Sequence, residues 1–134
     1  MTLADRIERL DGPDATIDEL ILLATGWTLE RAKDLVERAT WIDPQGERTA
    51  HRQGDGWFRP TASLYTAMTL VPEQATYINI EICARGLPGQ HCRVEIGWLD
   101  QAEDEIRLKG YAKTEALALC CAALRAQEAE GRGR

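Results

Sequence analysis

Three segments in the second half of the chain alternate between apolar and polar residues. They run over Thr76–Cys83, His91–Trp98 and Ile106–Tyr111, and the apolar side chains fall at even-numbered positions in all three. Successive side chains of a β-strand point to opposite faces. The pattern therefore predicts three strands, each with one apolar and one polar face.

The connections between these strands are short. Arg85–Gln90 contains two glycines and a proline, and Asp100–Glu105 is acidic, so both suit hairpin loops. Strands joined by short loops pair antiparallel. We therefore expect a three-stranded antiparallel meander.

A shared parity also predicts the strand register. If Ile82 lies opposite Cys92 and Trp98 lies opposite Ile106, all even-numbered side chains share one core face. Opposite charges directly across strands are favourable, and this register produces two such pairs. The pairs are Glu81 with Arg93 and Glu95 with Lys109.

The odd-numbered side chains of the meander form a polar face, which we take as the candidate binding surface. Tyrosine and arginine are frequent anchors of protein interfaces. The alternatives are a solvated sheet face or one covered by the N-terminal helices. The candidate binding residues are Tyr77, Asn79, Glu81, Arg93, Glu95, Lys109 and Tyr111.

Helix signals surround the meander. Thr2 can cap a first helix, Thr16 a second that ends at Gly26, and Thr28 a third that carries Leu29 and Val36 on one stripe. Further helices begin near Thr61 or Ser63 and at Thr114. The last of these is rich in alanine and extends to about Gln127. Because it is apolar almost all round, we expect it to pack on two sides, with either the N-terminal helices or a second copy in a homodimer.

These elements define one α+β domain, the usual number for 134 residues. It comprises N-terminal helices and an α-β-β-β-α unit with a three-stranded antiparallel meander sheet. The predicted parts are a helical N-terminal part (1–42), an exposed loop (43–56), the α-β-β-β-α unit (57–128) and a frayed tail (129–134).

The net charge of −6 argues against direct, sequence-specific binding of nucleic acid, which needs clustered cations. No apolar run is long enough to span a membrane and none resembles a signal peptide, so we expect a cytoplasmic protein. Four acidic residues near the second hairpin form a candidate surface for a cation or a basic partner, or a solvated loop. They are Asp100, Glu103, Asp104 and Glu105.

Catalytic motifs are scarce. The chain has no phosphate-binding loop, nucleophile elbow or metal-ligand spacing, so we expect no metal, no cofactor and no enzymatic activity. The cysteines read as small buried apolar residues. Cys83 and His91 can face each other across the first hairpin, but no third group to orient the histidine can be named.

Two segments carry a resemblance. Thr61–Glu73 has the pattern TAS-x-x-x-A-x-x-LVP, and Thr114–Ala126 forms an alanine-rich final helix. With the three strands between them, they resemble the phage ABA-sandwich domain, a group of short phage and prophage proteins. The resemblance implies helices on both sides of a sheet and a phage origin, and it brings no activity. Tyr65 and Glu115 depart from the pattern, and Thr28–Gly56 looks like an insertion.

These observations give one main hypothesis and two alternatives. The main hypothesis is a phage or prophage accessory protein in the bacterial host cytoplasm that binds a bacterial protein without catalysis, as an anti-CRISPR-type inhibitor does. The first alternative is a small-molecule or nucleotide sponge that uses Arg93, Lys109 and the tyrosines. The second is a thiol-dependent enzyme built on Cys83 and His91.

Overall fold

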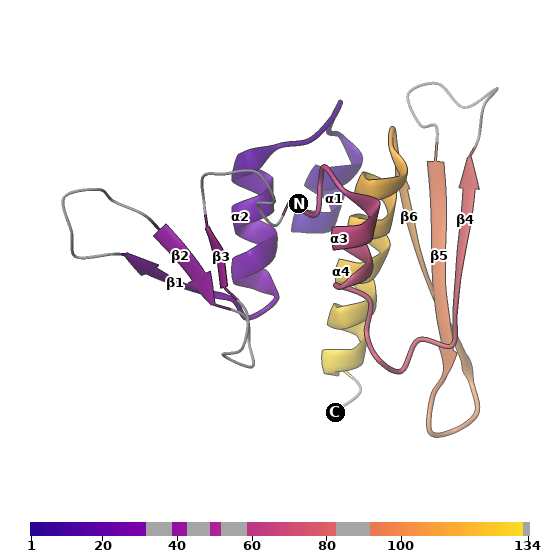
Figure 1. Cartoon of the computed structure of the whole chain (residues 1–134). Helices are drawn as coiled ribbons and strands as arrows, with labels where there is room; N and C mark the ends of the chain where they lie inside the picture. The colour runs from indigo at the N-terminus through magenta and orange to yellow at the C-terminus, as the bar shows by residue number, and fades with distance from the viewer. Residues whose placement is uncertain (32–38, 43–48, 52–58, 83–91, 133–134) are drawn as a thin grey trace.

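The computed structural model describes residues 1–31, 39–42, 49–51, 59–82 and 92–132. Within them, the chain forms helices and two antiparallel sheets, one of β1–β3 and one of β4–β6 (Figure 1). The molecule is therefore an α+β protein, as predicted. The elements are α1 (Leu3–Glu8), α2 (Ala15–Ala24), β1 (Thr28–Arg31), β2 (Ala39–Ile42), β3 (Thr49–His51), α3 (Leu64–Met68), β4 (Tyr77–Ile82), β5 (Cys92–Leu99), β6 (Glu105–Ala112) and α4 (Glu115–Arg132).

The β4–β5–β6 sheet is the predicted meander in the predicted register. Ile82 lies opposite Cys92, and Trp98 lies opposite Ile106. Both predicted charge pairs are formed as cross-strand neighbours. Local alternation together with matching charges was therefore enough to identify how these strands pair. The confirmed neighbours are Glu81 with Arg93 and Glu95 with Lys109.

The apolar face of this sheet packs against α4. Val94 and Ile96 are fully buried beneath the helix. The helix comes very near to the sheet at Gly110 of β6, where an added Cβ would lie 2.2 Å from the carbonyl oxygen of Ala118 and 2.6 Å from the amide nitrogen of Ala122. Only glycine lets the helix backbone come this near to the strand.

Helix α4 is also covered on its other side, by α1 and α3. Every residue from Leu117 to Ala123 is fully buried. The prediction of packing on two sides is confirmed, with the sheet on one side and α1 and α3 on the other, whereas a homodimer through this helix stays a prediction. Helix α4 continues to Arg132, so it includes residues 129–132 of the predicted frayed tail, and residues 133–134 lie outside the described residues.

Helix α1 is held at its start and along its length. Thr2 and Asp5 form a capping box, in which each side chain accepts from the other's backbone amide at 3.1 Å. Arg125 of α4 donates to Asp5 at 2.9 Å, to Glu8 at 2.6 Å and to the carbonyl oxygen of Lys109 at 2.9 Å. One side chain therefore joins α1, α4 and the outer edge of β6.

Helix α2 begins with Asp14 as its N-cap, so the predicted cap at Thr16 is wrong. Its Asp18 is fully buried and accepts from the Arg59 Nε at 2.9 Å, the Thr61 amide at 2.8 Å and the Thr61 hydroxyl at 2.7 Å. A buried carboxylate is tolerated only when its oxygens are satisfied in this way. We call these three residues the Asp18 latch, because they fix the chain next to α2 where it returns towards α3.

The segment after α2 corrects the prediction of a third helix. Gly26, at φ 92°, ends α2 as expected. Thr28–Arg31 then forms β1 and pairs with Ala39–Ile42, while Thr49–His51 adds a third strand inside the predicted exposed loop (43–56). The helical spacing was a local signal, and pairing with a threonine- and tryptophan-containing strand overrides it. Residues 43–48 and 52–56 of that loop lie outside the described residues.

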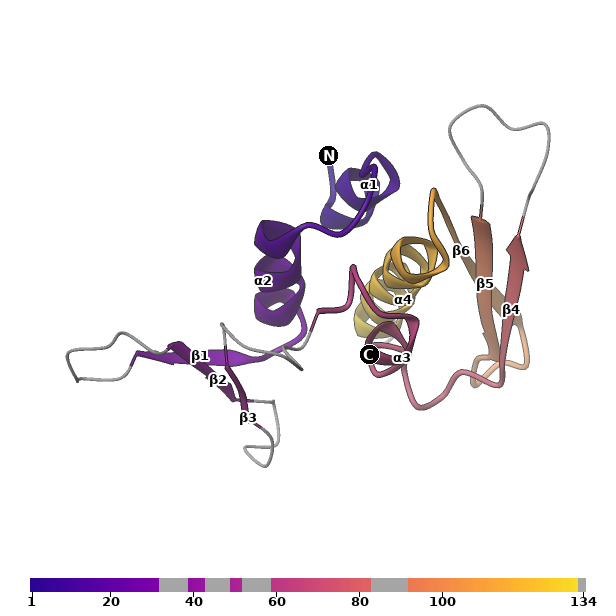
Figure 2. The same ribbon diagram turned by 45° about the horizontal axis from the view of Figure 1, so that its top comes forward.

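The layers are arranged on one side of the main sheet. Figures 1 and 2 show α4 next to the β4–β5–β6 sheet, α1 and α2 beyond α4, and β1–β3 beyond α2. No described element covers the opposite, polar face of the sheet. The alternative in which the N-terminal helices cover this face is therefore wrong, and the arrangement differs from the two-sided one that the resemblance implies.

In the described part of the chain, no helix combines the length and apolarity that crossing a bilayer would require.

Candidate functional site

The open polar face of the β4–β5–β6 sheet is a three-by-three grid of side chains. Antiparallel register aligns one residue from each strand in each row. All seven candidate binding residues predicted from the sequence lie on this grid. Its rows are Tyr77–Gly97–Arg107, Asn79–Glu95–Lys109 and Glu81–Arg93–Tyr111.

Gly97 leaves a gap in the grid that the ring of Tyr77 occupies. A Cβ at position 97 would lie 2.3 Å from the Tyr77 Cε1. The ring therefore lies over the glycine backbone, a cross-strand arrangement that lets an aromatic side chain shield a glycine in a sheet. From this position, the Tyr77 hydroxyl donates to Glu95 Oε1 at 3.2 Å.

Glu95 is the centre of the grid and is only 8% exposed although it lies on an open sheet face. Arg93 donates to its Oε2 at 3.4 Å, and the Arg107 Nε lies 3.7 Å from its Oε1. Tyr77 covers it from the third side. A carboxylate loses its hydration when it is covered, and these charged and hydroxyl donors compensate the loss.

The two arginines are each held by a second carboxylate. Arg107 contacts Glu105 through its Nε and through a second guanidinium nitrogen, both at 2.8 Å, and Arg93 lies 3.6 Å from Glu81. Their guanidinium groups are consequently fixed while still partly exposed, Arg93 at 33% and Arg107 at 56%. This network of carboxylates and arginines gives the grid fixed positions for its cations.

The charges also shift proton affinities on this face. The hydrogen bond from Arg107 holds the pKa of Glu105 below its ordinary value, and the same bond raises the pKa of Arg107. Partial burial of the phenol and then the negative charge of Glu95 raise the pKa of Tyr77. Tyr77 is therefore a neutral hydrogen-bond donor at physiological pH.

The remaining predicted residues complete the surface without joining the central network. Asn79 and Lys109 are exposed on either side of Glu95, and Tyr111 is half-buried next to Arg93. The exposed Leu99 extends the same face next to Glu105. Leu99 is not among the predicted binding residues, although its odd number is a signal that places it on this face.

Arg107 and Gly97 were also missing from the predicted binding set. Arg107 has the same parity as its predicted neighbours, so its strand position already places it on the predicted polar face. Gly97 has no side chain to attract attention, and its role becomes visible only when Tyr77 is placed directly opposite it. The local alternation pattern carries no such cross-strand information.

The predicted acidic loop does not form one cluster. Asp100 Oδ1 accepts from the amides of Ala102 and Asp104, each at 2.9 Å, and so closes the hairpin turn. Glu105 belongs to the sheet face, where it pairs with Arg107, while Glu103 and Asp104 are exposed. In the ranges that the structure describes, no three histidine, cysteine, aspartate or glutamate side chains are grouped to hold a metal ion.

Three of the four cysteines lie in the core. Cys92, Cys120 and Cys121 are buried thiols. Burial raises the pKa of Cys120 and raises that of Cys121 to about 12, so neither is a thiolate at neutral pH. Cys83 and His91, the pair considered for thiol chemistry, lie outside the described residues.

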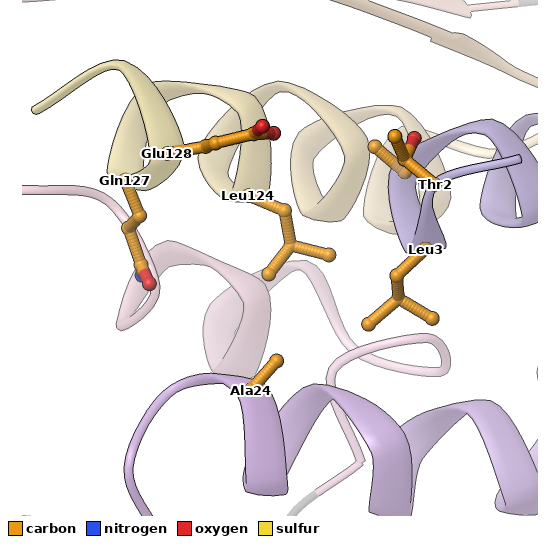
Figure 3. A pocket seen from close by; sticks show the side chains of 7 residues that line it. Thr2, Leu3, Ala24, Leu124, Gln127 and Glu128 are labelled. Carbon is orange, nitrogen blue, oxygen red and sulfur yellow. The ribbon is translucent and has the colours of Figure 1, made fainter. Parts of the chain in front are cut away.

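A separate cavity of about 320 Å³ lies between α1, α2 and α4. Figure 3 shows Leu3 and Leu124 pointing into it, with Ala24 opposite and Glu128 and Gln127 at its border. Gln127 donates to the Leu70 carbonyl oxygen at 2.5 Å. None of Arg93, Lys109 or the tyrosines lines this cavity, so it is not the polar pocket that the nucleotide hypothesis requires.

The chain was compared with protein-family models, with curated proteins and with solved structures, and none of them matches.

Proposed function

We propose that this protein binds a bacterial protein, without catalysis, through the open face of the β4–β5–β6 sheet. The observation that carries the proposal is the fixed set of Tyr77, Arg93 and Arg107 around the covered carboxylate of Glu95. The few residues that contribute most of the binding energy of an interface are enriched in tyrosine and arginine. Side chains that are already fixed lose little entropy on association.

The composition of the face favours a protein partner. Exposed cations stand beside the exposed apolar surfaces of Tyr77 and Leu99, and two carboxylates are interspersed with them. A partner surface that presents carboxylates to the arginines and an apolar patch to Tyr77 and Leu99 complements this face. The face has too few unpaired cations to follow a nucleic-acid backbone.

The proposed setting comes from the resemblance to phage ABA-sandwich proteins. On that basis, we propose a phage or prophage accessory protein that works in the host cytoplasm, with inhibition of a bacterial defence system as the first role to test. An inhibitor of this kind needs a specific surface and no catalytic group. The mixed charge of the grid supports docking to a protein rather than imitation of phosphate charge.

The test is affinity capture from bacterial lysate followed by measurement of the captured protein's affinity. We expect the double variant Arg93→Ala/Arg107→Ala to weaken binding at least tenfold, because interface arginines commonly contribute more than about 1 kcal/mol each. Arg9→Ala, an exposed arginine next to α1, is the matched control and should bind like the wild type. Equal affinity of the double variant and the wild type, with circular dichroism showing both folded, would refute the proposed surface.

Nucleotide binding is the alternative function, and a thermal unfolding measurement distinguishes it from binding of a protein. If Arg93 and Lys109 bind phosphates, nucleotides should raise the thermal unfolding temperature of the wild type and not that of Arg93→Ala/Lys109→Ala. Stabilisation of the wild type by nucleotides together with failure to capture a protein would replace the main proposal with this one.

A further inference from the structure

The two edges of the β4–β5–β6 sheet differ in how they are covered. Arg125 donates to the Lys109 carbonyl oxygen of β6, and α1 also contacts this strand. At the opposite edge, the main contacts of β4 with other described elements are those with β5 and α4, and neither lies along its outer edge (Figure 2). Strand β4 therefore presents backbone groups that another strand can pair with.

Strand β4 has few of the features by which proteins protect such an edge, and its one charged side chain is Glu81 on the polar face. Its register against β5 is continuous from Tyr77 to Ile82, without a bulge. It contains no proline and no lysine, and its core-facing positions hold isoleucine rather than an inward-pointing charge. Natural edge strands normally use at least one of these features to prevent pairing with other chains.

The apolar side of β4 is also incompletely covered. Helix α4 crosses the sheet mainly over β5 and β6. Ile78 and Ile80 consequently pack against the margin of the core and remain half-buried, whereas Val94 and Ile96 of β5 are fully buried. A strand placed next to β4 with its own apolar residues on the same side would complete this cover.

We propose that β4 pairs antiparallel with β4 of a second copy of this chain, about a two-fold axis that passes through Asn79. Ile78 then lies opposite Ile80 of the other copy on the core side. Tyr77 lies opposite Glu81 of the other copy on the polar side, so no like charges face each other. The sequence of β4 is thus complementary to itself when it runs antiparallel.

The direction of the faces limits the possible registers to those in which residues of the same parity face each other. A two-fold axis perpendicular to the sheet keeps both polar faces on the same side, so an odd-numbered residue must face an odd-numbered one. The two sheets then form one six-stranded sheet, with the α4 helices of both copies on the same side. The half-buried isoleucines of the two copies meet across the axis, in the area that neither α4 covers.

Disulfide cross-linking tests this register directly. Opposite residues in antiparallel strands have Cα atoms about 4.5–5.5 Å apart, within disulfide range, so Asn79→Cys should form a covalent dimer under mild oxidation. Glu81→Cys is the matched control on the same strand and face. Its two copies would be roughly 13 Å apart in this register and should not cross-link. Both variants are made with Cys83→Ser, so that this native thiol does not contribute.

Sedimentation analysis of the otherwise unmodified protein provides the second measurement. The wild type should form a concentration-dependent dimer, and Asn79→Lys should raise its dissociation constant about fivefold, because the position at the axis places two lysines opposite each other. Gln101→Lys, in the exposed second hairpin, should leave the dissociation constant of the dimer unchanged. A wild type that stays monomeric at all soluble concentrations, or equal cross-linking of the two cysteine variants, would overturn the proposal. Neither experiment involves a bacterial partner, so its result is independent of the proposed function.

Discussion

Glu95 shows what a single covered carboxylate can do on an open sheet face. Its charge orients Tyr77, Arg93 and Arg107, and these three side chains in turn exclude water from it. Glutamate is seldom buried unless its charge is paired. We interpret Glu95 as a positioning residue, which holds the groups that contact the partner.

The pKa of Tyr77 reports on this arrangement. Partial burial of the phenol and the charge of Glu95 both favour the neutral phenol, and together they raise the Tyr77 pKa. Glu95→Gln removes the negative charge but keeps the shape, so the pKa of Tyr77 should fall towards its ordinary value. NMR titration of the tyrosine ring carbons measures this pKa directly.

Glu81→Gln is the control for this titration. Glu81 is on the same strand and face as Tyr77 but outside its hydrogen bond, and the variant should leave the pKa nearly unchanged. An unchanged Tyr77 pKa in Glu95→Gln would show that the phenol and the carboxylate do not interact in solution.

At the scale of elements, the contact between β6 and α4 depends on one missing side chain. Gly110→Ala places a Cβ 2.2 Å from the Ala118 carbonyl oxygen, and a backbone atom cannot move aside as a side chain can. We expect the variant to lose about 1–3 kcal/mol of unfolding free energy, the usual range for overpacking. Denaturant titration followed by circular dichroism measures this loss.

Gly12→Ala is the matched control, since a Cβ at Gly12 has no neighbour within 4 Å. Its stability should stay within about 0.5 kcal/mol of the wild type, as expected for a surface substitution. If both variants were equally stable, the close contact of α4 with β6 would be wrong.

The elements also show where sequence reasoning succeeds and where it fails. The meander was predictable because its alternation is local and all three strands share one parity. The helical spacing of the apolar residues from Leu29 onwards predicts a helix where β1 forms, because the pairing of β1 with β2 depends on residues outside this local pattern. For the candidate site, the face on which its side chains lie was predictable, but their contacts were not. Parity placed its side chains on one face, but the covering of Glu95 results from contacts between three strands.

At the scale of the whole molecule, the β1–β3 sheet stands apart from the rest. Its strands contact one another and make no extensive contact with any other described element (Figure 1). The chain leaves α2 after Ala24 and is held again next to the same helix by the Asp18 latch. Asp18 and Ala24 are separated by about 9 Å of helix, so a short linker can join the two ends.

We therefore expect the fold to survive a shortening of the chain. In the shortened chain, a flexible linker of about six glycines and serines replaces residues 28–56. The thermal unfolding midpoint of the shortened chain should remain within a few degrees of that of the wild type, as measured by circular dichroism. Adding Asp18→Ala to the shortened chain should cost about 3 kcal/mol, because it leaves the buried Thr61 amide and hydroxyl without an acceptor. A shortened chain that is unfolded with an intact latch would contradict this division of the molecule.

The buried cysteine pair in α4 has a practical consequence for the dynamics of the molecule. Cys120 lies against the Pro60 carbonyl, and Cys121 lies against Ala4 and Glu8, so the two thiols face different elements. A reagent reaches either thiol only when its covering segment moves away. The modification rate of Cys120 thus measures how often the Pro60 segment opens. The modification rate of Cys121 measures how often α1 detaches.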